Sequence, residues 1–198
     1  AAASSMYYLE ARDFSSGSGG YILSAAAAVL DDYTSNISTA GRVTIGSSNT
    51  GRIETSGDKD WFAVSLTAGT TYSFRLDLAS TGGLNDPYLT LYNSAGQLIS
   101  ANDDGGGGVS SLISFTAAAS SMYYLEARDF SSGSGGYILS AALGAPTYSL
   151  APSSTSVNEG STATFILSTT NVAAGTQVAY TLSGVSAADV QGGSLTGT

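Results

Sequence analysis

The sequence predicts an all-β chain in which antiparallel, jelly-roll-like β-sandwich domains follow one another in tandem. Two features of its 198 residues support this fold class. The first is a series of short runs in which apolar and polar residues alternate, separated by clusters of glycine, asparagine, aspartate and serine, which is the pattern of strands joined by turns. The second is an internal repeat, because residues 1–26 recur without a change at residues 117–142.

The repeat sets the expected domain boundaries. The match ends at Ala27 against Leu143, and a segment of this length is too short to bury a core alone. We therefore expect residues 1–26 to be the terminal strands of a preceding repeat and residues 27–146 to form a complete sandwich. By this interpretation the chain is truncated at both ends.

The strands of the complete domain follow from the alternation. In Trp61–Leu66 the side chains of Phe62, Val64 and Leu66 fall on one side, which indicates a half-buried strand. The same period of two marks Tyr72–Leu78 and Tyr88–Tyr92, and further strands are expected at Arg52–Thr55, Gln97–Ala101, Ser111–Thr116, Met122–Ala127 and Gly136–Ala141. Many short strands joined by turns predict a sandwich or jelly roll.

The flanking segments are read in the same way. In the first copy, strands at Met6–Ala11 and Tyr21–Ser24 should repeat the pairings of their counterparts. The alanine-rich Ala25–Val29 is too short for a stable isolated helix and is expected to be a strand end and linker. Beyond Gly144–Pro146, residues 147–198 show their own alternation at Thr164–Ser168 and Gln177–Leu182, with too few strands to close a sandwich.

Composition excludes several classes of function. Asp and Glu number 15 against 6 Lys and Arg, and the net charge of −9 repels nucleic acid and anionic membranes. No apolar run approaches the ~20 residues that a membrane-spanning helix needs. Without histidine or cysteine, the chain lacks the usual general base, the thiol nucleophile, disulfides and thiolate metal sites. We expect no enzyme activity, no nucleic-acid partner and no membrane insertion.

Short motifs follow one another in a fixed order between Asp31 and Ala142. They are Gly51-Arg52-Ile53, Ser56-Gly57-Asp58-Lys59-Asp60-Trp61-Phe62, Leu66-Thr67-Ala68-Gly69 with Tyr72, Asp86-Pro87-Tyr88-Leu89-Thr90-Leu91-Tyr92, Asn102-Asp103-Asp104, Tyr123-Tyr124-Leu125 and Gly136-Tyr137. This series resembles the bacterial pre-peptidase C-terminal domain, called PPC. The resemblance implies a jelly-roll-like sandwich found in secreted proteins, often appended to proteases or arrayed in repeats, with calcium sites in some members.

The C-terminal segment has a resemblance of its own. Ser156-Val157-Asn158-Glu159-Gly160, followed by Thr164–Leu167 and Ala188-Asp189-Val190, is similar to the opening half of a Calx-β domain. Glu159 and Asp189 match acidic positions of that family. The acidic residues expected in the other half are absent, so we expect no calcium site in this segment.

Acidic residues gather at one end of a predicted hairpin. Asp86 enters the first strand of the hairpin Tyr88–Ala101, and Asp103 and Asp104 follow its second strand, so all three lie at the same end. Unneutralised carboxylates at such range repel by roughly 1 kcal/mol or more. Together with Asn102 they offer the oxygen ligands that calcium prefers, although Asp and Asn in loops also cap turns. We predict a calcium ion here.

A second calcium site is suggested by the resemblance to PPC domains that hold calcium near their entry linker. It would join Asp31, Asp32 or Asn36 in the linker with Asp58 and Asp60. Turn capping by these residues is again the alternative.

Trp61 lies out of phase with the apolar side of its strand, which predicts a position on the outer face of the sheet. An exposed tryptophan could stack on a sugar ring or contact a protein. Packing between neighbouring strands is the alternative explanation for most of the 12 tyrosines.

These observations predict a non-catalytic structural segment of a secreted or cell-surface bacterial repeat protein, stabilised by calcium, of the adhesin or filament-forming type. Head-to-tail self-association into a fibre is one expected interaction, because strands without partners tend to add to a neighbouring sheet. The alternative is an accessory module that attaches a secreted hydrolase to a polysaccharide or a surface protein.

Overall fold

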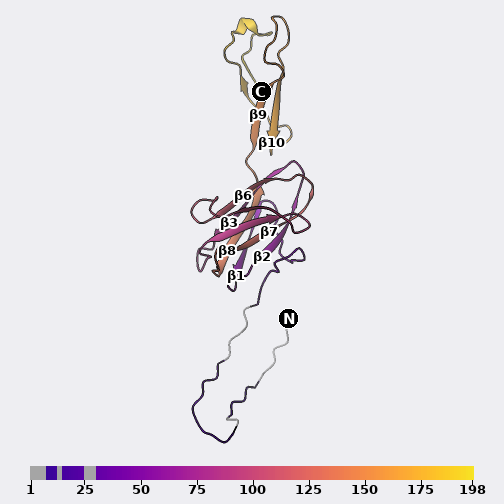
Figure 1. Cartoon of the computed structure of the whole chain (residues 1–198). Coiled ribbons are helices and arrows are strands. Elements are labelled where there is room, and N and C mark those ends of the chain that lie inside the picture. Colours follow the sequence, from indigo (N-terminus) through magenta and orange to yellow (C-terminus); the bar gives the residue numbers. More distant parts are fainter. Residues whose placement is uncertain (1–7, 13–14, 25–29) are drawn as a thin grey trace. The chain divides into compact units, whose positions relative to one another are not determined.

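The computed structural model describes residues 8–12, 15–24 and 30–198 and divides into two compact units, Ala1–Leu30 and Asp31–Thr198 (Figure 1). The second unit contains a β-sandwich of eight strands, β1 to β8, followed by four shorter strands, β9 to β12. The all-β fold class predicted from the sequence is confirmed. In the described residues the only helix is the 3-10 turn η1 (Ala187–Asp189).

Two four-stranded sheets form the sandwich, with the strand orders β1-β8-β3-β6 and β2-β7-β4-β5. Their strands are β1 (Ser47–Ile53), β2 (Asp60–Leu66), β3 (Thr71–Leu78), β4 (Pro87–Tyr92), β5 (Leu98–Asn102), β6 (Ser111–Thr116), β7 (Ser121–Asp129) and β8 (Gly135–Leu143). Every pairing between these strands is antiparallel.

The core lies between the two sheets. Inward and outward residues alternate along the strands, so that Phe62 and Leu125 of one sheet and Phe74, Leu76 and Leu139 of the other are fully buried in one apolar cluster. This is the face that the period of two predicts. Burial of such side chains contributes roughly 1.5–3 kcal/mol each, which makes this core the main source of stability.

The β4–β5 hairpin brings the segments that flank it to one end of the sandwich. The turn between β4 and β5 is closed by Asn93, whose side-chain oxygen accepts hydrogen bonds from the backbone N–H of Ala95 (3.0 Å) and Gln97 (2.9 Å). The resulting hairpin pairs Leu89 with Asn102 at its open end. The segments that precede β4 and follow β5 therefore leave the sheet side by side.

Some predicted strands have different bounds. The strand expected at Arg52–Thr55 is β1, which begins at Ser47 and ends at Ile53. β1 is an edge strand that buries few side chains, so its sequence is mostly polar. It therefore lacks the alternation of apolar and polar residues from which the other strands were predicted. The strand expected at Gln177–Leu182 is shortened to Tyr180–Thr181.

The C-terminal segment forms two small antiparallel sheets. One pairs β9 (Thr147–Pro152) with β10 (Phe165–Thr170), and the other pairs β11 (Tyr180–Thr181) with β12 (Thr196–Gly197). The sequence did not predict β9, because it directly follows the segment Gly144–Pro146 that we interpreted as a boundary. Most side chains of this segment are exposed.

The strands predicted in the first copy are wrong for the part that the structure describes. Residues 8–11 and 21–24 belong to no strand and are exposed, although the same sequence forms β7 and β8 in the second copy. A strand needs partners for its backbone groups. β7 lies between β2 and β4, and β8 between β1 and β3, whereas residues 8–11 and 21–24 pair with no strand of the described part of the chain. Ala25–Val29 and the start of the strand at Met6 lie outside the described residues.

No helix in the described part of the chain is long and apolar enough to span a membrane.

Candidate metal centre

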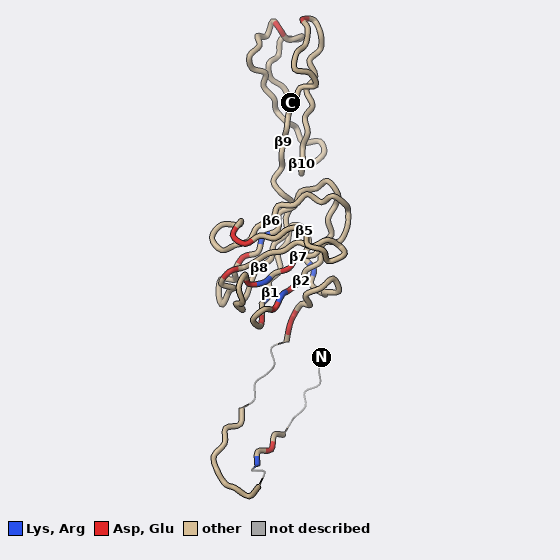
Figure 2. Tube along the Cα trace, viewed as in Figure 1, with Lys and Arg blue, Asp and Glu red and all other residues tan. Residues whose placement is uncertain are grey.

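Four carboxylates converge where the chain enters the sandwich. Asp31, Asp32, Glu54 and Asp60 each place one oxygen within 4.8 Å of the others. We call this group the Asp60 cluster. Its members come from the entry segment, from the residue after β1 and from the first residue of β2, and Figure 2 shows the acidic positions in the entry segment and in the loops of the sandwich.

Asp60 is the most enclosed member of this cluster. It is 0% exposed and pairs with Ala127 of β7. Its oxygen Oδ2 accepts a hydrogen bond of 2.6 Å from the hydroxyl of Tyr137. Its other oxygen, Oδ1, is buried and has no hydrogen-bond partner. A buried carboxylate oxygen without a partner costs free energy, so this oxygen is suited to hold a proton or to ligate a cation.

The hydroxyl of Tyr137 reaches Asp60 because the residue opposite it is a glycine. Gly51 of β1 pairs with Tyr137 of β8, and a Cβ atom on Gly51 would lie 2.1 Å from the Tyr137 hydroxyl. The tyrosine ring is itself fully buried and packs edge-on against Phe62. Gly51 therefore leaves the space for the Tyr137 hydroxyl that donates to Asp60.

The electrostatics of the Asp60 cluster favour a bound cation. Burial raises the pKa of Asp60 to about 8, against the lowering effect of the Tyr137 hydrogen bond, and the charges of Asp32, Asp58 and Glu54 raise it further. Burial also raises the pKa of Glu54 and that of Asp32. Carboxylates whose charged forms are disfavoured in this way become stable anions when a cation neutralises them.

A second group lies at the open end of the β4–β5 hairpin, as the sequence predicted. Asp86, Asp103 and Asp104 bring carboxylate oxygens within 4.8 Å of one another. We call them the Asp103 cluster. Burial and then the charges of Asp86 and Asp104 raise the pKa of Asp103, and its oxygen Oδ1 is buried without a hydrogen-bond partner.

Three residues predicted as ligands accept hydrogen bonds from the backbone. The side-chain oxygen of Asn102 accepts from the N–H of Gly105 and of Leu112, both at 2.8 Å. Asp58 accepts from the N–H of Lys59 (2.8 Å) and of Glu54 (3.2 Å). Turn capping, the alternative interpretation, therefore describes Asn102 and Asp58. Asn36 likewise accepts from the N–H of Ser38 at 2.9 Å.

Glu54 belongs to the Asp60 cluster, and sequence reasoning missed it. Its position directly after the apolar residue Ile53, and close in sequence to Asp58 and Asp60, could have identified it as a candidate ligand. In the C-terminal segment, Asp189 accepts from the N–H (2.9 Å) and the hydroxyl (2.6 Å) of Ser186 and so caps a turn.

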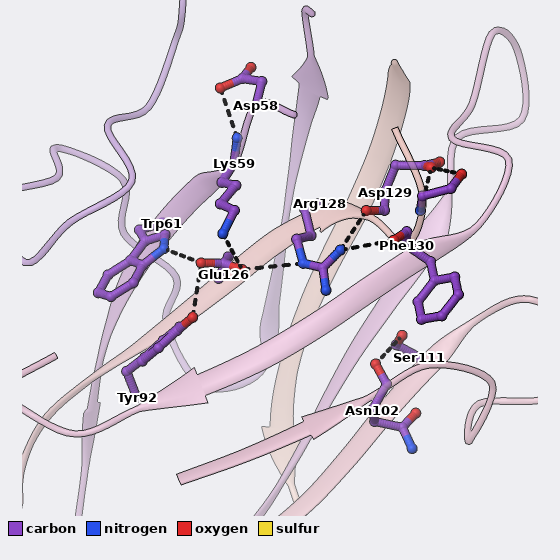
Figure 3. A network of polar contacts seen from close by, with 11 residues as sticks. Asp58, Lys59, Trp61, Tyr92, Asn102, Ser111, Glu126, Arg128, Asp129 and Phe130 are labelled. Atoms are coloured by element: carbon purple, nitrogen blue, oxygen red, sulfur yellow. Dashed lines mark hydrogen bonds and ion pairs between the residues drawn. The ribbon is translucent and has the colours of Figure 1, made fainter. Parts of the chain in front are cut away.

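A buried carboxylate lies on the outer face of the second sheet (Figure 3). Glu126 of β7 accepts hydrogen bonds from the indole N–H of Trp61 (2.8 Å) and from the hydroxyl of Tyr92 (3.0 Å). Its other oxygen lies 3.5 Å from Arg128 and 3.8 Å from Lys59. Sequence reasoning did not single out Glu126, because alternation places it on the polar face without showing what covers it.

This network corrects the expectation of an exposed Trp61. Trp61 lies on the outer face, as its phase predicts, but it is only 7% exposed and stacks on Tyr92 at 4.2 Å between ring centroids. Tyr88 is half-buried beneath the guanidinium of Arg128. A hollow of about 350 Å³ lies beside these residues. Trp61 itself is therefore covered, whereas Tyr88 and Tyr92 are half-buried and line the hollow.

The described residues define an antiparallel β-sandwich module with acidic loops. A family model of the bacterial pre-peptidase C-terminal domain matches residues 58–129, and the chain therefore contains a PPC domain there. The PPC domain is a non-catalytic β module, and PPC domains occur in secreted proteins. The resemblance stated from the sequence motifs is confirmed for these residues.

Solved structures with similar folds share little sequence with this chain. The PPC domain of a collagenase from Bacillus anthracis is 16% identical, with a TM-score of 0.42, over 51% of this chain and 92% of that one. A periplasmic inhibitor of g-type lysozyme from Aeromonas hydrophila is 16% identical, with a TM-score of 0.39, over 52% and 98%. The surface-associated copper-binding protein CorA of Methylomicrobium album BG8 is 10% identical, with a TM-score of 0.37, over 52% and 98%. No curated protein sequence matches the chain.

Proposed function

We propose that the sandwich is a calcium-stabilised, non-catalytic structural module of a secreted bacterial repeat protein. The unpartnered, fully buried oxygen of Asp60 carries this proposal. Calcium takes six to eight oxygen ligands at about 2.3–2.6 Å from carboxylates, carbonyls and water. The four members of the Asp60 cluster offer such oxygens from the entry segment, from the residue after β1 and from the first residue of β2.

The position of the cluster gives the cation a structural role. The entry segment contributes Asp31 and Asp32, the end of β1 contributes Glu54 and the start of β2 contributes Asp60. A cation bound to all four would join the entry segment to both sheets. The Asp103 cluster would in the same way join the segments that flank the β4–β5 hairpin.

We expect calcium to raise the melting temperature of the protein and a chelator to lower it. A ligand that binds only the folded state stabilises it by about 2.7 kcal/mol when its free concentration is 100 times the dissociation constant. Differential scanning calorimetry of the full chain with calcium and with EGTA measures this. An unchanged melting temperature on adding EGTA to calcium-loaded protein contradicts the proposal.

The Asp60→Asn variant tests the contribution of the Asp60 cluster to calcium binding separately from that of the Asp103 cluster. The amide keeps the acceptor for Tyr137 but removes a charge, so calcium should stabilise the variant less than the wild type. Without calcium, at pH 8, the variant should be at least as stable as the wild type, because it relieves repulsion among the carboxylates. Glu10→Gln, which removes an exposed charge outside both clusters, is the matched control and should leave the calcium response unchanged.

The stability of the calcium-free protein should fall as the pH rises from about 4 to about 8. The raised pKa of Asp60, about 8, means that the folded state holds protons that the unfolded state, with an aspartate pKa near 3.9, has released. The stabilisation from this proton is therefore complete below pH ~4 and is lost through pH ~8. Urea unfolding at several pH values in EGTA measures the effect, and in Asp60→Asn the slope should be smaller.

The rest of the chain fits a structural part of a larger protein. The similarity of residues 147–198 to a Calx-β domain, the repeated segment and the lack of the usual catalytic side chains support an adhesin-like or filament-forming protein at the cell surface or outside the cell. Attachment of a hydrolase to a polysaccharide or a surface protein is less well supported, since Trp61, the tryptophan of the outer face, is covered.

A further inference from the structure

We infer that residues 6–26 can act as a substitute strand pair that replaces β7 and β8 in the sandwich of a second copy of this chain. This inference does not depend on calcium. It rests on the sequence identity of the two copies, on the central positions of β7 and β8, and on the exposure of the described residues of the first copy.

Within one chain, residues 117–142 are the second copy of the repeat, and they supply β7 and β8, which occupy central positions in the two sheets. β7 pairs with both β2 and β4, and β8 pairs with both β1 and β3. Leu125, Tyr137 and Leu139 from this copy are each 0% exposed in the core. Any segment that replaces the copy must reproduce these side chains in the same register.

The first copy carries the same side chains and leaves them in solvent. Leu9, Tyr21 and Leu23 correspond to Leu125, Tyr137 and Leu139, and they are 64%, 72% and 55% exposed. Placed in the sandwich, Leu9 would take the position opposite Phe62 and Leu91 that Leu125 occupies. The loop between the two strands is also identical in the copies, so the register of both strands is preserved.

Insertion of the first copy into the chain's own sandwich would conflict with the Asp60 cluster. Ala26 corresponds to Ala142, near the end of β8, whereas Asp31 belongs to the Asp60 cluster beside the start of β8, where Gly135 pairs with Ile53. These ends of β8 are about 23 Å apart at ~3.3 Å per residue. The connection from Ala26 to Asp31 spans at most about 18 Å. Insertion within one chain would thus pull Asp31 out of the cluster, and a second chain has no such constraint.

Exchange of this kind is head-to-tail. Each chain would donate its first copy and accept another in its sandwich, and a contact between two different surfaces continues from chain to chain unless it closes into a ring. In the wild-type protein the tethered β7 and β8 have the higher effective concentration. The exchange therefore becomes visible when the chain's own strands are disabled.

The full chain with Leu125→Asp tests the inference. A charge in the core disables the chain's own β7, so at low concentration the sandwich should be unfolded, as the fluorescence of Trp61, the single tryptophan, would report. At high concentration we expect Trp61 to become buried again in oligomers, measured by light scattering after gel filtration. Leu9→Asp alone should fold like the wild type.

The double variant Leu9→Asp/Leu125→Asp is the decisive comparison, because it disables both copies and should stay unfolded at every concentration. Adding a peptide of residues 1–26 should restore its Trp61 signal, and a peptide with Leu9→Asp should not. The inference is overturned if Leu125→Asp is as unfolded as the double variant at all concentrations and the peptide restores nothing. Recovery as a monomer overturns the assignment to a second chain.

Discussion

Replacing Glu126 by alanine is expected to lower the free energy of unfolding by about 2–4 kcal/mol, because two donors lose their acceptor and each buried donor left unpaired costs about 1–3 kcal/mol. The side chain of Glu126 is only 4% exposed. Its loss leaves the indole N–H of Trp61 and the hydroxyl of Tyr92 without their acceptor, and leaves Arg128 and Lys59 without their counter-ion (Figure 3). Urea unfolding followed by Trp61 fluorescence at low protein concentration measures the change.

The chain contains its own control for this substitution. Glu10 is the counterpart of Glu126 in the first copy, and its side chain is 78% exposed in a contact with Arg12. Glu10→Ala should change the stability by no more than about 0.5 kcal/mol, as surface substitutions usually do. Glu126→Gln should cost less than Glu126→Ala, since one oxygen can still accept a hydrogen bond. Equal effects of Glu126→Ala and Glu10→Ala would show that the network contributes no stability.

Glu10 and Glu126 also show why the sequence predicted the fold better than the site. Alternation alone predicts that both glutamates face away from the core, and this is correct for Glu126. It cannot reveal that Trp61 and Tyr92 cover the second of them, because these two residues are brought to Glu126 by the pairing of β2 and β4 with β7. Identical local sequence therefore has a different energetic weight in the two copies.

The sequence could predict those acidic residues that a single hairpin brings together. Asp86 and Asp103 flank one hairpin, and antiparallel pairing alone brings them together. Glu54 and Asp60 meet because β1 and β2, in different sheets, end and begin beside the entry segment, which no local pattern encodes. For Asn102, the choice between metal ligand and turn cap depends on which backbone N–H groups lie nearby, and this follows only from the folded loop.

The Gly51→Ala substitution connects the core to the candidate cation site. We expect it to lower the free energy of unfolding by about 3 kcal/mol, at the upper end of the range for overpacking. The new methyl group would lie 2.1 Å from the hydroxyl of Tyr137, so the fully buried ring of Tyr137 would have to shift within the core. The small gain from replacing a glycine within a strand, about 0.5–1 kcal/mol, does not offset this overlap.

Displacement of Tyr137 should also weaken the hydrogen bond of 2.6 Å that its hydroxyl donates to Oδ2 of Asp60. We therefore expect Gly51→Ala to change the calcium-induced shift of the melting temperature, measured by calorimetry. Gly20→Ala, at a glycine where an added Cβ meets nothing within 4 Å, is the control and should leave both the stability and the calcium response unchanged. If Gly51→Ala were as stable as wild type, Tyr137 would have to adopt another position, and Gly51 would not be what holds Asp60 in place.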